Sequence, residues 1–280
     1  MVVQPASEQS WVARIFRGPA REWIWDRTIA LYFRTETGRP TMKGSGVLLK
    51  IADAAFILSA GHVLKHAQDM EIQIGPMAKG SRVIKPQDGQ VGISPDLDDV
   101  DIGFVRLSEE TASELAVHKK FTRMNNLDLH LSEPCDGAYC FLGFPQRDNS
   151  PDYDKNRINP TPFHYLCEPL RNPDEAKPGI NVLFKVTKDI VILSDLENSD
   201  VEEQRMPELN GISGCGMWRL FGVGDRADHS HRWDPSWIRL VGIEHTWARR
   251  KWVKGTFIRQ AINLIANTYP ELRTSIELTW

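Results

Sequence analysis

The sequence of 280 residues predicts an all-β protein made of two six-stranded β-barrels, with a helix at the C-terminal end. Two observations support this fold class. From Thr28 onward, short apolar runs alternate with turn residues, which is the pattern of successive strands. These runs fall into two groups of about six, and a segment rich in helix formers separates the groups. Many short strands with turns between them are typical of barrels and sandwiches.

The first group predicts a barrel over residues 27–107. Its expected strands are Ile29–Arg34, Gly44–Lys50, Ala54–Ser59, Glu71–Ile74, Arg82–Lys85 and Ile102–Leu107. The second and third of these read as a pair joined by a tight turn at Ala52 and Asp53. Residues 1–26 form an N-terminal extension, whose tryptophans Trp11, Trp23 and Trp25 we expect on the outside of the body.

A linker over residues 108–136 and a second barrel over residues 137–257 follow. The linker carries an expected helix, Ser108–Phe121, which opens with Ser-Glu-Glu. The expected strands of the second barrel are Ala138–Leu142, Phe163–Cys167, Val182–Val186, Met217–Phe221, Arg239–Ile243 and Thr256–Ile258.

The chain closes with a helix and tail over residues 258–280. Phe257–Asn267 has helical periodicity, with Ile258, Ile262 and Ile265 on one stripe. Two polar stretches, Asp148–Pro160 and Asp195–Glu208, are expected to be long surface loops.

The bulk properties indicate a protein of a reducing cytoplasm. Met1–Arg14 lacks an apolar core of signal-peptide length, and no stretch is long enough to span a membrane. Four cysteines in a chain of this length do not suggest a secreted disulfide scaffold. The net charge of −3 implies no attraction of the whole protein to polyanions. We expect no cofactor, no membrane partner and no nucleic-acid partner.

Three motifs point to nucleophilic catalysis. Gly211-Ile-Ser-Gly-Cys-Gly216 places Ser213 between glycines, where the backbone can turn sharply and leave N–H groups free. A serine hydroxyl also needs a base and a group that orients the base. An apolar run ending in Ser59-Ala-Gly-His62 offers the base, and Asp101, directly before the run Ile102–Leu107, offers the acid.

These motifs, in the order His, Asp, Ser, resemble those of the chymotrypsin/trypsin-like serine proteases. The resemblance implies that Ser213 is the nucleophile, His62 the general base and Asp101 the residue that orients His62. It also implies an oxyanion hole made by the N–H groups of Gly211 and Ser213, and a protein or peptide substrate. The substrate-binding residues that it implies are Glu244, His245, Thr246, Trp247 and Pro207.

Departures from the family pattern bear on activation and specificity. Ile212 stands where secreted members carry the Asp that receives a new N-terminus, so activation by zymogen cleavage is not expected. The chain is more similar to bacterial intracellular trypsin-like peptidases, in which substrate or a regulatory protein partner orders the loops, for example in a regulatory or anti-phage system. Pro207 stands where trypsin has the Asp that selects basic residues, so we expect small or apolar residues at the cleaved position.

Several alternatives remain open at this point. A catalytically latent module that binds protein partners, or serves as a scaffold component, is the main rival from another class. Cys215 offers a second nucleophile two positions past the serine, and Asp98 and Asp99 compete with Asp101, although they read as solvated loop charges. The basic run Arg249–Lys251 and the histidines of Asp228–His231 give weaker nucleic-acid and metal hypotheses.

Overall fold

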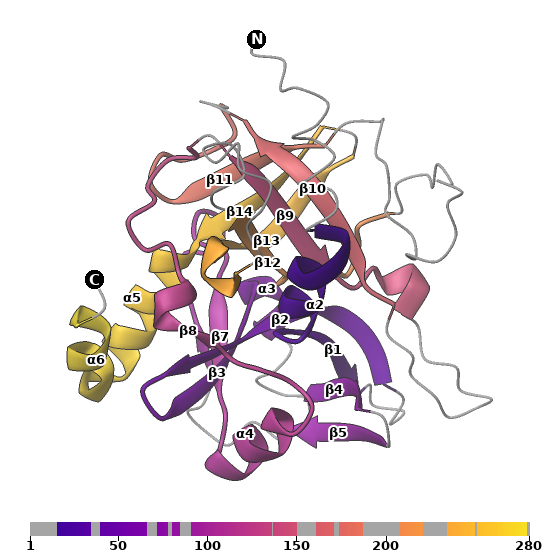
Figure 1. Ribbon diagram of the computed structural model, residues 1–280, viewed down its shortest axis with the longest axis vertical. Coiled ribbons are helices and arrows are strands. Elements are labelled where there is room, and N and C mark those ends of the chain that lie inside the picture. The colour runs from indigo at the N-terminus through magenta and orange to yellow at the C-terminus, as the bar shows by residue number, and fades with distance from the viewer. Residues whose placement is uncertain are drawn as a thin grey trace.

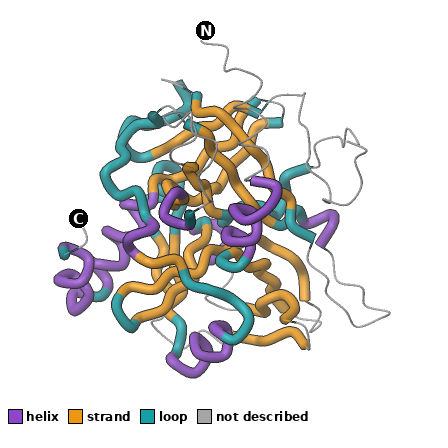
Figure 2. Tube along the Cα trace, viewed as in Figure 1, coloured by secondary structure: helices purple, strands orange, loops and turns teal. Residues whose placement is uncertain are grey.

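The structure confirms the all-β class, with two β bodies and a C-terminal helix (Figure 1, Figure 2). The computed structural model describes residues 16–34, 40–65, 72–77, 80–84, 91–135, 137–149, 161–170, 174–186, 208–220, 234–249 and 251–278. In these ranges, no helix combines the length and the apolarity that crossing a membrane requires.

The first body is an eight-stranded sheet. Its strands are β1 (Thr28–Arg34), β2 (Pro40–Ile51), β3 (Ala54–Ser59), β4 (Ile72–Met77), β5 (Gly80–Ile84), β6 (Val91–Ile93), β7 (Gly103–Arg106) and β8 (Thr122–Arg123). Seven of them follow the order β5-β4-β1-β2-β3-β7-β6 with antiparallel neighbours, and β8 pairs with β2 in parallel. The two strands that the sequence did not predict, β6 and β8, have three and two residues, too few to show an alternating pattern.

The second body is a closed six-stranded barrel. Its strands are β9 (Ala138–Gly143), β10 (Phe163–Pro169), β11 (Asn181–Lys185), β12 (Gly216–Leu220), β13 (Ile238–Ala248) and β14 (Trp252–Phe257). They close in the order β10-β11-β14-β13-β12-β9, and every pair is antiparallel. All six strands overlap those that the sequence predicted.

Each body has its own apolar interior, and a third cluster joins the two. Leu31, Ile57 and Val105 lie in the interior of the first body, and Phe141 and Val241 lie in that of the second. The joining cluster takes residues from the opposite faces of the same strands and from the helices α2 (Arg21–Trp25) and α5 (Ile258–Thr268). The two bodies therefore share a core of buried apolar surface, which is the main force that holds them together.

Helices occupy the positions that the sequence predicted for them. α4 (Glu109–Ala116) begins at Ser108, whose hydroxyl accepts the backbone N–H of Thr111 at 3.2 Å and so caps the helix. α5 lies within one residue of the expected C-terminal helix at each end and buries Ile258, Ile262 and Ile265. The remaining short elements are η1 (Phe16–Ala20), α3 (Gly61–Leu64), η3 (Met124–Asn126), η4 (Gln146–Asn149), η5 (Pro235–Trp237), η6 (Pro270–Leu272) and α6 (Arg273–Glu277).

The N-terminal extension differs from the expectation that its tryptophans lie outside the body. Trp23 is buried in the joining cluster, where its ring packs edge-on against Trp218 of β12 with the ring centroids 5.5 Å apart. Trp25 contacts Phe144, and Trp11 lies outside the described residues. The helix α2 is therefore a brace that contacts both bodies.

Candidate active site

The pairing of β3 with β7 places His62 beside Asp101. Ser59 at the end of β3 pairs with Gly103 at the start of β7, so the residues just after β3 and just before β7 leave the sheet at the same edge. His62 follows Ser59 by three residues and Asp101 precedes Gly103 by two. Gly61 permits the close approach, because a Cβ there would lie 3.1 Å from the Asp101 carboxylate and 2.4 Å from Leu97.

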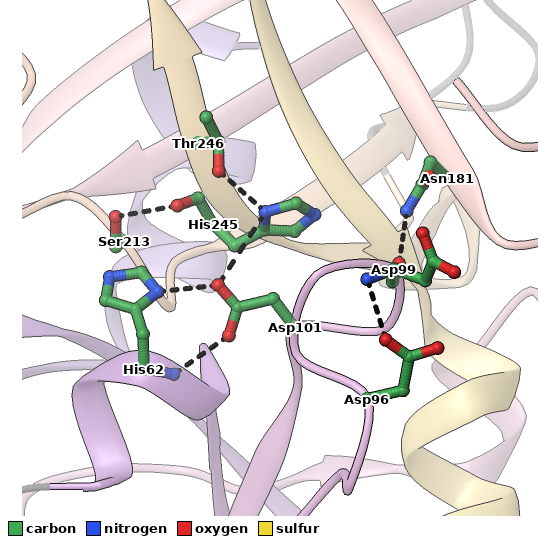
Figure 3. A network of polar contacts seen from close by, with 8 residues as sticks. All are labelled: His62, Asp96, Asp99, Asp101, Asn181, Ser213, His245 and Thr246. Atoms are coloured by element: carbon green, nitrogen blue, oxygen red, sulfur yellow. Dashed lines mark hydrogen bonds and ion pairs between the residues drawn. The ribbon is translucent and has the colours of Figure 1, made fainter. Parts of the chain in front are cut away.

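Both oxygens of the Asp101 carboxylate bind His62 (Figure 3). The backbone N–H of His62 donates to Oδ1 at 2.8 Å, and the Nδ1 atom lies 2.6 Å from Oδ2. An ionised carboxylate only accepts hydrogen bonds, so the ring proton lies on Nδ1 and Nε2 keeps its lone pair. The His62 side chain is 47% exposed, so this lone pair belongs to a ring that solvent and substrate can reach.

Asp101 is held in the ionised form although it is buried. Burial by itself raises the pKa of the Asp101 carboxyl, but hydrogen bonds from the His62 ring and backbone lower it, and the net pKa lies below its ordinary value. The electrostatic attraction of His62 and His245 acts in the same direction. Asp101 can therefore orient His62 and stabilise the imidazolium that forms when His62 takes a proton.

The loop that carries Ser213 is a sharp turn built on two glycines. Gly211 and Gly214 have φ values of +92° and +93°, which side chains oppose. A Cβ on Gly211 would lie 2.7 Å from the backbone nitrogen of Gln146, and one on Gly214 would lie 2.0 Å from the hydroxyl of Ser59. Within the described part of the chain, the backbone N–H groups of Gly211 and Ser213 donate to no protein acceptor, so both are free to bind an oxyanion.

Strand β2 of the first body fixes this loop. The N–H of Ser45 donates to the carbonyl of Ser213 at 2.8 Å, and the Ser45 hydroxyl donates to the carbonyl of Gly211 at 3.1 Å while accepting the N–H of Phe144. The Ser59 hydroxyl in turn donates to the carbonyl of Ser45. Sequence reasoning missed the role of Ser45, because a serine in a strand gives no signal of a partner 166 residues away, and it noted Ser59 only as part of the histidine motif.

The hydroxyl of Ser213 donates to the backbone carbonyl of His245, with the two oxygens 3.3 Å apart. Among the described residues, no hydrogen bond joins this hydroxyl to Nε2 of His62. The hydroxyl proton of Ser213 is therefore directed to the His245 carbonyl in the structure, and hydrogen bonds between catalytic groups often form fully only when substrate is bound.

The residues that were expected to bind substrate differ in how deeply they are buried. The side chains of Glu244 and His245 are buried, and both backbone groups of Glu244 pair with Gly214 and Cys215 of the loop that carries Ser213. The backbone of Glu244 is therefore engaged within the protein, and its role in binding substrate stays a prediction. Thr246 is exposed and Trp247 is half-buried against the barrel interior. Pro207 lies outside the described residues.

The acidic loop before Asp101 is not simply solvated. Asp99 forms an ion pair with Lys177, and its backbone carbonyl accepts the side-chain N–H of Asn181 at 3.0 Å (Figure 3). Both partners belong to the second body, so Asp99 connects the Asp101 loop to the barrel. Asp98 is exposed, as expected.

The alternative nucleophile and metal sites find no support among the described residues. The Cys215 thiol is fully buried, and burial raises its pKa well above the ordinary value, which suppresses the reactive thiolate. No group of three potential metal ligands occurs in the described ranges. Asp228–His231 and Arg250 lie outside them.

Comparison with known proteins gives structural likenesses only. No protein-family model and no curated protein matches the chain. A thermostable serine protease, AL20, from an extremophilic microorganism is 11% identical with a TM-score of 0.49, over 91% of this chain and 99% of its own. A catalytically active tobacco etch virus protease in complex with its product is 12% identical with a TM-score of 0.45, over 89% and 80%. A structure on coupled folding and binding of the Sesbania mosaic virus VPg protein is 14% identical with a TM-score of 0.46, over 88% and 90%.

Proposed function

We propose that the protein is a serine endopeptidase that cleaves peptide bonds through an acyl-enzyme intermediate, with Ser213, His62 and Asp101 as its catalytic triad. The observation that supports this most is the hold of Asp101 on His62. One hydrogen bond from the His62 ring and one from its backbone N–H hold this residue on Asp101. The contact lies at the end of β3, whose Ser59 binds Ser45, the residue that holds the Ser213 loop.

In the proposed reaction, the Ser213 oxygen attacks the peptide carbonyl carbon while Nε2 of His62 takes the hydroxyl proton. The carbonyl oxygen becomes an oxyanion that accepts the N–H groups of Gly211 and Ser213. His62 then donates its proton to the leaving amine as the C–N bond breaks. A water molecule, deprotonated by His62, attacks the acyl ester and frees Ser213.

The end of β13 is the proposed site for the substrate backbone. Beyond Glu244 this strand pairs with β14 on one side, while the ladder with β12 ends at the pair of Ile243 and Gly216. The free edge of Thr246 and Trp247 can add an extended peptide as one more strand, a common way to bind peptides.

We also propose that zymogen cleavage plays no part in activation. Ile212 is fully buried beside Leu209 and Cys215 in the barrel interior, so this position holds the loop by apolar packing and offers no carboxylate to a new N-terminus. Ordering by substrate or by a partner protein, as in bacterial intracellular peptidases of regulatory or anti-phage systems, is the activation mode that we propose.

A catalytically latent module is the second candidate. It is favoured by the hydrogen bond from the Ser213 hydroxyl to the His245 carbonyl, which directs the hydroxyl proton to the carbonyl and not to His62. In this case the barrels serve as an interaction or scaffold component.

A fluorophosphonate probe separates the two candidates, because it phosphonylates an activated serine with loss of fluoride. We expect labelling of the wild-type chain at Ser213. We also expect the rate of peptide cleavage to fall roughly 10⁴-fold or more in Ser213→Ala and His62→Ala. Labelling that requires an added partner protein or substrate indicates a latent protease. No labelling in any condition, together with full biological function of Ser213→Ala, rejects the peptidase and leaves the scaffold.

A further inference from the structure

The side chain of Asn149, at the end of η4, is buried and uses all of its polar groups. Its Nδ2 atom donates to the carbonyl of Pro145 at 2.7 Å and to that of Thr161 at 2.9 Å, and its Oδ1 atom accepts the N–H of Thr161 at 2.6 Å. From the first body, the hydroxyl of Tyr32 donates to the backbone carbonyl of Asn149 at 3.1 Å. Both N–H donors and the oxygen of the side-chain amide are therefore engaged, which fixes the amide in one orientation.

A chain of hydrogen bonds runs from Asn149 to one donor of the proposed oxyanion hole. The Pro145 carbonyl that Asn149 binds belongs to the same peptide group as the N–H of Gln146. This N–H donates to the carbonyl of Asn210 at 2.6 Å. The Asn210 carbonyl in turn belongs to the same peptide group as the N–H of Gly211. Two peptide groups therefore connect the Asn149 side chain with the N–H of Gly211.

The geometry of a peptide group makes this chain directional. Each of the two groups is planar and trans, so its C=O and its N–H point in opposite directions. The bond from Gln146 to the Asn210 carbonyl therefore turns the N–H of Gly211 away from η4, and within the described ranges this N–H meets no protein acceptor. Successive hydrogen bonds also polarise one another, which strengthens the last donor of the chain.

We infer that Asn149 is a positioning residue of the oxyanion hole, which sets the direction of the Gly211 N–H through these two peptide groups. This inference rests on the proposed peptidase function. Because a glycine can change its φ at little steric cost, outside bonds must hold the peptide group before Gly211. Without the Asn149 amide, only the N–H of Asp148, at 3.2 Å, stays on the Pro145 carbonyl, and the N–H of Gln146 is less firmly aimed.

The kinetic test compares Asn149→Asp and Asn149→Ala with the wild type. Asp keeps the shape of the side chain, but a carboxylate cannot donate to the Pro145 carbonyl. Negative charge grows on the phosphonyl oxygen of the fluorophosphonate probe as Ser213 attacks, so we expect the limiting labelling rate to fall roughly 10- to 100-fold in both variants, with little change in the half-saturating probe concentration. Asp148→Ala, at an exposed neighbouring position in η4, is the matched control and should keep the wild-type rate.

Alkylation of His62 by iodoacetamide separates this role from general damage to the site. The Nε2 lone pair forms the new N–C bond as iodide leaves, and no oxyanion develops in this reaction. We expect this rate, followed by mass spectrometry of the peptide that contains His62, to stay close to that of the wild type in both Asn149 variants. An unchanged labelling rate overturns the inference, as does an equal loss of labelling and alkylation.

Amide hydrogen exchange keeps the inference separate from the proposed function, because it needs no catalysis. In the wild type, we expect slow exchange of the Gln146 N–H although Gln146 is exposed, since this N–H is held in the chain of hydrogen bonds. In Asn149→Asp, its protection should fall while that of the β12 amides stays.

Two outcomes of the exchange measurement overturn the inference. One is a wild-type Gln146 amide that exchanges as fast as in an unstructured peptide, a result that decides the matter even if no variant folds. The other is an equal protection of Gln146 in the wild type and in Asn149→Asp. A protein that shows the expected exchange changes but never reacts with the probe contradicts only the peptidase proposal.

Discussion

Replacing Glu244 by Gln should stabilise the protein and change how its stability depends on pH. The Glu244 carboxyl is fully buried, and neither of its oxygens has a hydrogen-bond partner among the described residues. Burial raises its pKa well above the ordinary value of 4.5, and the negative charge of Asp101 adds to this effect. Glu244 is therefore protonated in the folded protein over a pH range in which it is ionised in the unfolded chain.

The sign and size of the effect follow from this difference in bound protons. A raised pKa in the folded state means that the folded protein binds the extra proton, so the carboxyl costs stability increasingly as the pH rises above about 4.5. The slope reaches ~1.4 kcal/mol per pH unit while the folded carboxyl stays protonated. Between pH 5 and pH 7 the advantage of Glu244→Gln should therefore grow by up to about 3 kcal/mol, or roughly 5–10 °C in Tm.

Thermal and urea unfolding of both proteins at pH 5, 6 and 7 measures this growth. Glu133→Gln, at an exposed position, is the control for the loss of one carboxyl group at the surface. Parallel stability curves for wild type and Glu244→Gln would refute the reasoning, since they would mean that the carboxyl ionises equally in both states. A lower stability of Glu244→Gln at pH 7 would refute it as well.

Three further predictions test the contacts around the proposed triad and the packing of α2. Gly214→Ala places a Cβ 2.1 Å from the Ser45 carbonyl oxygen, at a position whose φ is +93°. The fluorophosphonate probe should therefore label Ser213 at least roughly 100-fold more slowly in this variant, and a labelling rate near that of the wild type would contradict the loop geometry. Ser45→Ala removes the hydroxyl that binds the Gly211 carbonyl, and should lower the limiting labelling rate about tenfold without changing the half-saturating probe concentration. An unchanged limiting rate with a raised half-saturating concentration would contradict this role of Ser45. Trp23→Ala empties a buried site beside Trp218 and should lower the free energy of unfolding in urea by roughly 3–5 kcal/mol; a loss below about 1 kcal/mol means that α2 is not a brace.

The parts of the site that the sequence predicted are those that depend on local pattern. His62 and Asp101 each stand next to an apolar strand, and the pairing of those strands is enough to bring them together. Gly211 and Gly214 mark the turn around Ser213 because only glycine tolerates their backbone angles without strain. The other strands of both bodies were also predicted from local pattern, the apolar runs between turn residues. β6 and β8 are too short to produce such a pattern.

The parts that the sequence did not predict depend on contacts between distant segments. Ser45 and Asp99 resemble ordinary polar residues in the sequence, yet each binds a group of the second body. His245 is predicted to bind substrate from the resemblance of its strand to the substrate-binding strand of the family, and strict alternation along β13 does not reveal that it also forms a bulge. Its contact with Asp101 required the structure.

The distribution of these contacts bears on how activity is controlled. Ser45 binds the nucleophile loop from the first body, Lys177 and Asn181 bind the Asp101 loop from the second, and His245 reaches Asp101 across the same boundary. All of these contacts link one body to the other, so a displacement between the bodies would alter the distance from Ser213 to His62. In the structure the Ser213 hydroxyl is bound to the His245 carbonyl and must be released from it to donate to His62. A partner or substrate that contacts both bodies would therefore alter the relative position of Ser213 and His62, as the proposed activation requires.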